Sequence, residues 1–388
     1  MSDINFDFDE LTERRLSGSM KWDSEGDASD IIPLWVADMD FRTAPSITSA
    51  LLRRVETGIF GYTHVAPDYY KAILNWFGNR HHWDINSRRI IYTSGVVPAI
   101  SAIIKALTNP GKGVILQTPA YNCFFSSIRN NKCNIVENPL KRMDTATGFT
   151  YKLDFENLAM LAARPENTLL ILCNPHNPSG RVWSREELTE ICRICRENGV
   201  RVVSDEIHCE LVHPDAPEYI PYATIDPDAV VCTSPSKAFN TAGLQIANII
   251  CPDEESQLRI DRAINDNEVC DVNPFGIVGL KAAYNEGGKW LDALNDYLYG
   301  NYKLLRNFFS QRFPQLPVCD SQSTYLAWIY IRPLGMSADD LRDILLREAR
   351  VRVASGSSYG DPDYIRINYA CPRARLLEAL ERIGKINL

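Results

Sequence analysis

Between residues 89 and 251, short apolar runs alternate with segments of helical pattern, and this alternation limits the possible folds more than any other feature. Strands that alternate with helices in this way pair in a mostly parallel sheet, with helices on its faces. The sequence therefore predicts an α/β fold. Its expected strands are 90–92, 114–117, 133–137, 168–173, 201–204, 229–232 and 246–251.

One intervening helix is well marked, between the fourth and fifth of these runs. Ser184 and Glu187 have the spacing of a capping box, in which each side chain binds the other residue's backbone N–H. Apolar residues recur on one face after Glu187, and Gly199 is placed to end the helix.

After about residue 275 the order of the elements changes. The chain of 388 residues is long enough for two domains. We predict a large domain over 45–280, a smaller α+β domain over 281–388, and an N-terminal arm, 1–44, that forms part of the smaller domain. The expected elements of the C-terminal part are a long helical stretch at 276–313, strands at 325–331 and 364–369, and helices at 338–348 and from 372.

Charge and hydropathy limit the expected partners. The formal net charge is −8, whereas a nucleic-acid-binding surface is basic. No apolar run approaches the about 20 residues of a membrane span. The first ten residues are acidic and lack the basic and apolar regions of a signal peptide. We expect a cytoplasmic protein that binds a small molecule and neither nucleic acid nor membrane.

Eleven cysteines are scattered along the chain, with one C-x-x-C pair at Cys192 and Cys195. The pair falls inside a predicted helix, without a second pair at metal spacing and without a nearby histidine. We interpret the pair as helix packing, predict no metal site, and expect reduced thiols.

Lys237 follows the apolar run 229–232 and the small hydroxyl residues Ser234 and Ser236. A lysine beside a buried strand end is costly unless it is paired or used in chemistry. A desolvated amine can form an imine with a carbonyl cofactor, and the hydroxyl groups suit a phosphate. Taken alone, this string is more often a loop with a solvated lysine.

Three other strand ends carry residues suited to a ligand. Gly95 precedes a helix start, where backbone N–H groups bind phosphate. The run 173–180 holds Asn174 and Asn177 between prolines and a glycine, and Asp205 follows another strand. Each has a plainer alternative: a turn, a rigid loop, or a helix cap. Because ligands bind at the carboxyl ends of parallel strands, the four ends together favour a site.

This set of residues resembles the fold-type I family of pyridoxal-phosphate enzymes, the aspartate-aminotransferase superfamily. In detail it is similar to the cystathionine β-lyase branch represented by MalY and PatB. The resemblance covers nearly the whole chain. The strings that carry it are 33–41 (PLWVADMDF), 60–62 (FGY), 174–183 (NPHNPSGRVW), 204–208 (SDEIH) and 236–240 (SKAFN).

The resemblance implies roles for individual residues. Lys237 would link to the cofactor and then move the proton at the substrate Cα, Asp205 would pair with the ring nitrogen, and Tyr121 would stack on the ring. Asn177 would contact the ring hydroxyl. The further cofactor-binding residues would be Gly95, Val96, Val97, Asn174, His208, Ser234 and Ser236, and Tyr62 would reach a neighbouring subunit's phosphate in a homodimer with shared sites.

For the substrate, the resemblance implies contacts with Ala37, Asn177 and Arg366, with Arg366 clamping the α-carboxylate; its plainer alternative is an exposed strand arginine. One departure is Gln245, where many aminotransferases carry an arginine on the phosphate. The implied activity is a carbon–sulfur β-lyase acting on cystathionine, cysteine or a cysteine S-conjugate. An aminotransferase of the same fold and a cofactor-binding regulatory protein are the alternatives.

Overall fold

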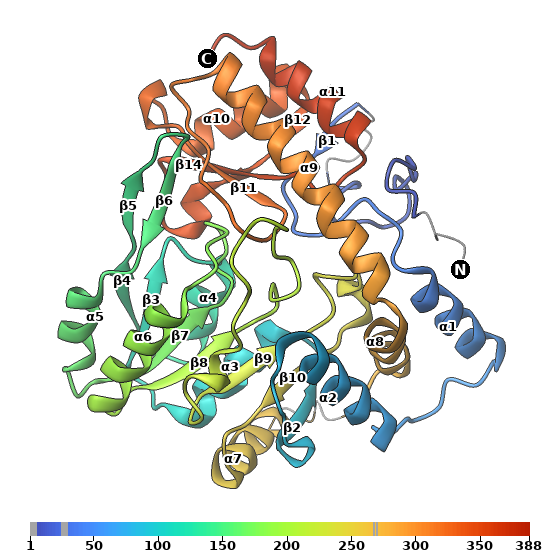
Figure 1. Ribbon diagram of the computed structural model, residues 1–388, viewed down its shortest axis with the longest axis vertical. Coiled ribbons are helices and arrows are strands. Elements are labelled where there is room, and N and C mark those ends of the chain that lie inside the picture. Colours follow the sequence, from blue (N-terminus) through green and yellow to red (C-terminus); the bar gives the residue numbers. More distant parts are fainter. Residues whose placement is uncertain (1–5, 25–29, 267, 269–270) are drawn as a thin grey trace.

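A seven-stranded sheet lies at the centre of the computed structural model, which describes residues 6–24, 30–266, 268 and 271–388 (Figure 1). Every neighbouring pair is parallel except those of β10, which runs antiparallel to both of its neighbours. The predicted α/β fold with a mostly parallel sheet is confirmed. In spatial order the strands are β2 (Ile90–Thr93), β10 (Ala247–Ile250), β9 (Val230–Thr233), β8 (Arg201–Asp205), β7 (Asn167–Cys173), β3 (Gly113–Thr118) and β4 (Asn134–Pro139).

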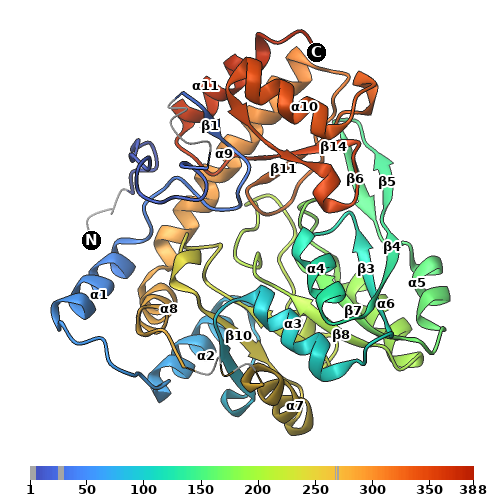
Figure 2. The same cartoon turned by 180° about the vertical axis from the view of Figure 1, so that it is seen from behind.

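Alternate residues of the central strands enter two separate apolar cores, as the two-residue period of a strand requires. In β7, Leu169 and Ile171 face the core formed with α3 (Val96–Leu107), α4 (Asn122–Asn130) and α7 (Glu254–Asn265). Leu170 and Leu172 face the core formed with α5 (Phe155–Ala162) and α6 (Arg185–Glu197). The two views show these helix groups on opposite faces of the sheet (Figures 1 and 2). The capping box predicted for Ser184 and Glu187 begins α6.

A third core joins the remaining helices to a small antiparallel sheet of three strands. Its strands are β11 (Leu326–Tyr330), β14 (Tyr364–Asn368) and β13 (Ala354–Ser355). Its helices are α1 (Pro45–Glu56), α2 (Pro67–His81), α8 (Pro274–Glu286), α9 (Gly288–Arg312), α10 (Ala338–Ile344), which continues as a π-helix (Leu345–Ala349), and α11 (Arg373–Gly384). In Figure 1 the small sheet lies above the large one, with α9 running alongside both.

Two further strand pairs lie outside the large and the small sheet. Strand β1 (Ile32–Pro33) pairs in parallel with β12 (Val351–Arg352), so this part of the N-terminal arm lies beside the C-terminal part of the chain. The hairpin of β5 (Lys141–Asp144) and β6 (Phe149–Lys152) extends toward the small sheet (Figure 1). The exact division into domains stays a prediction. Within the described residues, no helix combines the length and apolar character of a membrane span.

The helical stretch predicted over 276–313 is helical in the structure, but it is divided into two helices, α8 and α9. They meet at Gly287, which belongs to neither. A Cβ atom at this position would lie 2.5 Å from a ring carbon of Phe239 and 2.6 Å from the carbonyl oxygen of Ala283. The close approach of Phe239, 48 residues earlier in the chain, therefore requires a glycine at the break.

Candidate active site

The four strand ends singled out in the sequence meet around one cavity of about 210 Å³. Strands β2, β7, β8 and β9 end at this edge of the sheet, and α3 begins there. Parallel strands bring their carboxyl ends to one edge, which explains why residues as far apart as Gly95 and Lys237 converge. The predicted residues that line the cavity are Ala37, Gly95, Val96, Val97, Tyr121, Asn177, Asp205, His208, Ser236 and Lys237.

Lys237 has a partly buried amine that is held by a backbone carbonyl. Its Nζ donates to the carbonyl oxygen of Ala37 at 2.7 Å. Burial, followed by the positive charge of Arg366, lowers the pKa of Lys237 to about 8, with Asp38 and Asp205 acting in the opposite direction. A larger fraction of this amine is neutral at physiological pH than for an exposed lysine, and only the neutral amine is a nucleophile or a base.

Asp205 lies at the end of β8 and is buried beside the cavity. Its Oδ1 accepts one backbone hydrogen bond, from the N–H of Ile207 at 3.1 Å. Burial raises the pKa of this carboxyl to about 6, against the lowering effects of that hydrogen bond and of Lys237. A buried carboxylate with so few partners gains from a cation placed next to it.

His208 and Tyr121 supply a neutral imidazole and an aromatic ring to the cavity wall. Burial, with the charges of Lys237 and Arg366, lowers the pKa of His208 to about 3, and its Nδ1 has no hydrogen-bond partner among the described residues. Burial raises the pKa of the Tyr121 phenol. Both groups therefore stay uncharged across the physiological range.

The N-terminus of α3 forms the wall suited to an anion. Gly95 is the N-cap residue, and no side chain caps this helix, so the first backbone N–H groups are available to a ligand. Ser236 lines the cavity nearby. The hydroxyl of Ser234 instead donates to the carbonyl oxygen of Ile246 at 2.6 Å and accepts from the N–H of Ser236 at 3.1 Å.

Arg366 is buried in the middle strand of the small sheet, next to the cavity. Its Nη1 donates to Asn177 Oδ1 at 3.2 Å and its Nη2 to the carbonyl oxygen of Trp35 at 3.0 Å. The guanidinium lies 4.6 Å from the ring centre of Tyr359. Its Nε is buried and has no hydrogen-bond partner among the described residues, so this N–H still lacks an acceptor. The exposed-arginine alternative is excluded.

Three predicted cofactor-binding residues lie outside this cavity. Asn174 donates to Glu206 Oε1 at 3.3 Å and to the carbonyl oxygen of Ile220 at 2.9 Å. Tyr62 is 96% exposed in the loop after α1, where it is free to contact a second subunit. Ser234, with its hydroxyl bound to Ile246, is the third. The role of each stays a prediction.

Sequence reasoning missed several residues that shape the site. Tyr325 donates to the carbonyl oxygen of Ala37 at 3.0 Å, and Trp35 and Tyr359 hold Arg366. The hydrogen bonds of Tyr325 with Ala37 and of Arg366 with Trp35 join segments about 290 to 330 residues apart, and no local pattern marks them. Gln245, noted only as a departure, also lines the cavity.

The residues present fit pyridoxal 5′-phosphate. Asp205 would hold the ring nitrogen, the α3 N-terminus and Ser236 the phosphate, Tyr121 the ring face, and Lys237 the carbonyl carbon. The observation that supports the fit is a set of buried polar atoms without adequate partners, on Asp205 and His208, facing the same cavity as a lysine of lowered pKa.

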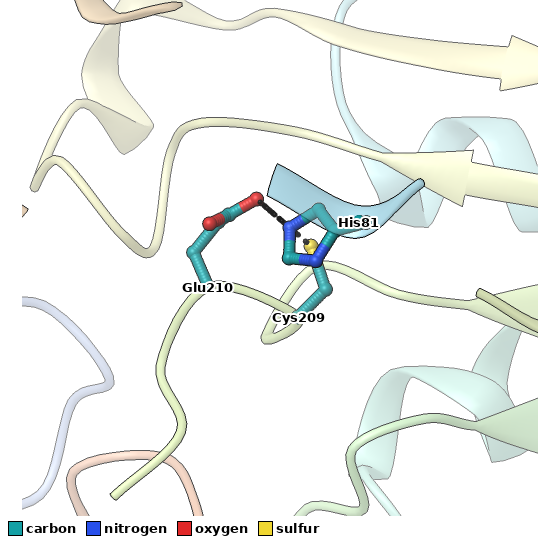
Figure 3. A group of neighbouring side chains, drawn as sticks. All are labelled: His81, Cys209 and Glu210. Atoms are coloured by element: carbon teal, nitrogen blue, oxygen red, sulfur yellow. Dashed lines mark hydrogen bonds and ion pairs between the residues drawn. The ribbon is translucent and has the colours of Figure 1, made fainter. Parts of the chain in front are cut away.

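Among the described residues, one group of metal-ligand types occurs outside the cavity, formed by His81, Cys209 and Glu210 (Figure 3). The Glu210 carboxylate accepts from Trp76 Nε1 at 2.6 Å, contacts His81 Nε2 at 2.7 Å and pairs with Arg80 at 3.4 Å. Cations and N–H donors already surround this carboxylate. The group is therefore a hydrogen-bonded ion cluster that ties the end of α2 to the loop after β8.

Comparisons with known proteins agree with this geometry. The model of the family "Aminotransferase class I and II" matches residues 29–383. Cystathionine β-lyase PatB of Bacillus subtilis is 39% identical over 97% of this chain and 98% of its own length, and the Escherichia coli protein MalY is 34% identical over 96% of each. The PLP-bound C–S lyase of Staphylococcus hominis superposes with a TM-score of 0.90 at 30% identity and covers 98% of both chains. This chain therefore belongs to the class I and II aminotransferase family of pyridoxal-phosphate-dependent enzymes, on the carbon–sulfur lyase branch that includes PatB and MalY.

Proposed function

We propose that this enzyme is a carbon–sulfur β-lyase that releases a thiol from Cβ of cystathionine, cysteine or a cysteine S-conjugate, and leaves pyruvate and ammonia. The observation that carries the proposal is a lysine amine of lowered pKa and a buried arginine, both bonded to carbonyls of one segment, in a chain similar to PatB.

Bound pyridoxal phosphate supplies the electron-withdrawing ring that allows a proton to leave the substrate Cα. Arg366 binds the substrate α-carboxylate, and its contacts with Asn177 and Trp35 fix the direction of the guanidinium. Lys237 takes the α-proton, and the thiolate then departs from Cβ with the bonding electrons. The Asp205 carboxylate in the cavity wall stays negatively charged during the reaction. Water converts the remaining three-carbon fragment to pyruvate and ammonia.

An aminotransferase is the second candidate, because the matching family model bears that description. Both reactions begin with loss of the α-proton, so the residues named above serve either one. The two reactions differ in their next step: a lyase expels a leaving group from Cβ, whereas an aminotransferase retains the substrate nitrogen and needs a keto acid to turn over.

The deciding experiment incubates the purified enzyme with an S-substituted cysteine in the absence of any keto acid. We expect continuous formation of pyruvate, ammonia and thiol in equal amounts. Turnover that stops after one equivalent and resumes only when a keto acid is added would replace the lyase assignment with the aminotransferase one.

Arg366→Ala is expected to lower kcat/KM by about 100-fold, because a buried charge-assisted bidentate contact is lost. The matched control is Arg332→Ala, which removes an arginine in the short 3-10 helix after β11 that is mostly exposed and only weakly paired. Steady-state kinetics on an S-substituted cysteine checks both variants. Equal kcat/KM in the two would show that Arg366 has only a structural role.

We also propose a homodimer in which Tyr62 completes the partner's phosphate site. Tyr62, Ile59 and Phe60 are large, exposed side chains in one loop, and Leu52 on α1 is exposed as well. Large exposed apolar side chains close together in the chain are typical of an interface. The proposal stands on this exposure together with the family resemblance.

Sedimentation is expected to give a dimer at assay concentration, and Tyr62→Ala is expected to weaken cofactor affinity about ten-fold through a lost phosphate contact. Met160→Ala, at an exposed position on α5, is the control. Mixing Tyr62→Ala subunits with Lys237→Ala subunits should raise activity above that of either variant, because each hybrid dimer holds one complete site. An active monomer would contradict this arrangement.

A further inference from the structure

One short segment, residues 34–41, separates the two groups that act on the substrate. Its carbonyl at Trp35 accepts from Arg366 at 3.0 Å, and its carbonyl at Ala37 accepts from Lys237 at 2.7 Å and from Tyr325 at 3.0 Å. The backbone of this segment therefore sets the relative positions of the Lys237 amine and the Arg366 guanidinium.

The same segment is held from the other side by the N-terminal arm. Lys21 Nζ lies 3.3 Å from both the carbonyl oxygen and Oδ1 of Asp38, and 3.2 Å from Oδ1 of Asp40. Arg14 donates to Oδ2 of Asp38 at 2.8 Å, to Oδ1 of Asp40 at 2.7 Å and to the carbonyl oxygen of Met39 at 3.0 Å. Lys21 and Arg14 thus form ion pairs with Asp38 and Asp40, the two residues on either side of Met39.

The ion pair between Lys21 and Asp40 is buried, so breaking it would leave a charge without water or its partner. The side chains of Lys21 and Asp40 are both 0% exposed, and Trp22 Nε1 adds a hydrogen bond of 2.8 Å to Asp40. Burial alone would raise the pKa of Asp40, yet Lys21, Trp22 and Arg14 lower it below the ordinary value. A buried charge without its partner is costly, and residues 6–24 of the arm form no helix or strand. The ion contacts therefore fix where the arm and the segment sit.

We propose that Lys21 is a positioning residue for Lys237. Lys21 binds Asp38 and Asp40 and thereby fixes the carbonyl of Ala37, which accepts the hydrogen bond of the catalytic amine. The positive charge of Lys21 also offsets the negative charge of Asp38. This inference rests on the role proposed for Lys237 and adds to it a residue more than 200 positions earlier in the sequence.

The effect on the amine has a definite sign. Charged and titratable groups approach Lys237 from every element packed around it. The negative charge of Asp38 raises the pKa of Lys237. Loss of Lys21 leaves that charge less compensated, so the pKa of Lys237 rises further. Neutralising Asp38 removes the charge and lowers the pKa of Lys237. The groups that face Lys237 are Arg366 from β14, Asp38 from the segment, Asp205 and His208 from the end of β8 and its loop, and Cys123 from α4.

The test uses the full-length chain freed of cofactor and measures the rate of covalent pyridoxal-phosphate capture against pH. Capture follows the neutral amine, so the midpoint reports the Lys237 titration, near 8 in the native chain. We expect Lys21→Met to move the midpoint up by about half a unit or more, and Asp38→Asn to move it down. Equal midpoints in all chains, or shifts in one direction for both variants, would overturn the proposal.

The loaded enzyme gives a second readout. Lys21→Met is expected to lower kcat about ten-fold with little change in KM, because the substrate still binds while the amine is misplaced, and Lys21→Arg is expected to restore most of the loss. The control is Arg42→Met, which breaks an exposed pair with Glu10 between the segment's end and the arm. If Lys21→Met does not fold, the isosteric Asp38→Asn still decides, since an unchanged midpoint in that variant refutes the charge effect.

The role of Lys237 and the positioning role of Lys21 can be tested separately. If Lys237→Ala still captures the cofactor covalently, the assignment of Lys237 is wrong. If Lys237 is the site of capture while Lys21→Met behaves as the native chain in both readouts, only the positioning role is wrong.

Discussion

Lys237→Ala is expected to abolish the visible absorption band of the cofactor-bound enzyme and to lower kcat by about 10⁴-fold or more. The lysine amine is both the point of covalent attachment and the base at Cα, so its loss removes two functions at once. Lys237→Arg should be equally inactive, because a guanidinium keeps its proton at any accessible pH.

Absorption spectra and lyase assays on the purified variants check this expectation. Lys141→Ala is the control, since that side chain is 55% exposed and pairs with Asp154 on the surface. A yellow, active Lys237→Ala enzyme would place the chemistry elsewhere. A variant that binds the cofactor without the band and without turnover is the expected result, because the α3 N-terminus and Asp205 are left intact.

The sheet could be predicted from the sequence because its strands carry their own signal. Runs such as 168–173 are apolar on both faces, as a strand covered by helices on both sides must be. Once the strands are parallel, their ends share one edge, and residues as distant as Gly95 and Lys237 are brought together without any further information. Most of the candidate site follows from that topology.

Side-chain directions at those ends could not be predicted, because distant partners decide them. Ser234 looks like a phosphate ligand in sequence, but its hydroxyl is bound to the carbonyl of Ile246, just before the antiparallel strand β10. Asn174 turns away toward Glu206, a buried carboxylate that also accepts from Tyr219, Ser204 and the N–H of Tyr222. The direction of each side chain depends on a residue whose position cannot be predicted from the neighbouring sequence.

The same reason explains what was missed in the C-terminal part. Phe239 leaves room only for a glycine at position 287, and the Ala37 carbonyl meets Tyr325 and Lys237. Helical period and strand period describe a segment's own faces. They carry no information about which remote side chain will meet a given backbone atom.

Asp205→Asn is expected to lower kcat by about 10³-fold while the cofactor remains bound. The carboxylate is buried under the site, and its negative charge favours a protonated ring nitrogen, which makes the ring a stronger electron acceptor. The amide keeps the size and the hydrogen bond to Ile207 but carries no charge. Asp226→Asn removes a buried carboxyl outside the cavity and should leave kcat unchanged.

The titration of Asp205 gives this variant a second signature. Burial raises the pKa of Asp205 to about 6, and a cation beside it in the complex lowers that pKa, so cofactor binding releases a proton below pH 6. Cofactor affinity of the native chain should therefore show a rise centred near pH 6, below the separate rise near pH 8 that the Lys237 amine causes. In Asp205→Asn the lower of these two rises should be absent, as measured by equilibrium titration of the cofactor-free chain between pH 5 and 8. Near-normal kcat together with an unchanged affinity profile would show that Asp205 serves only as a cap for the turn at Ile207.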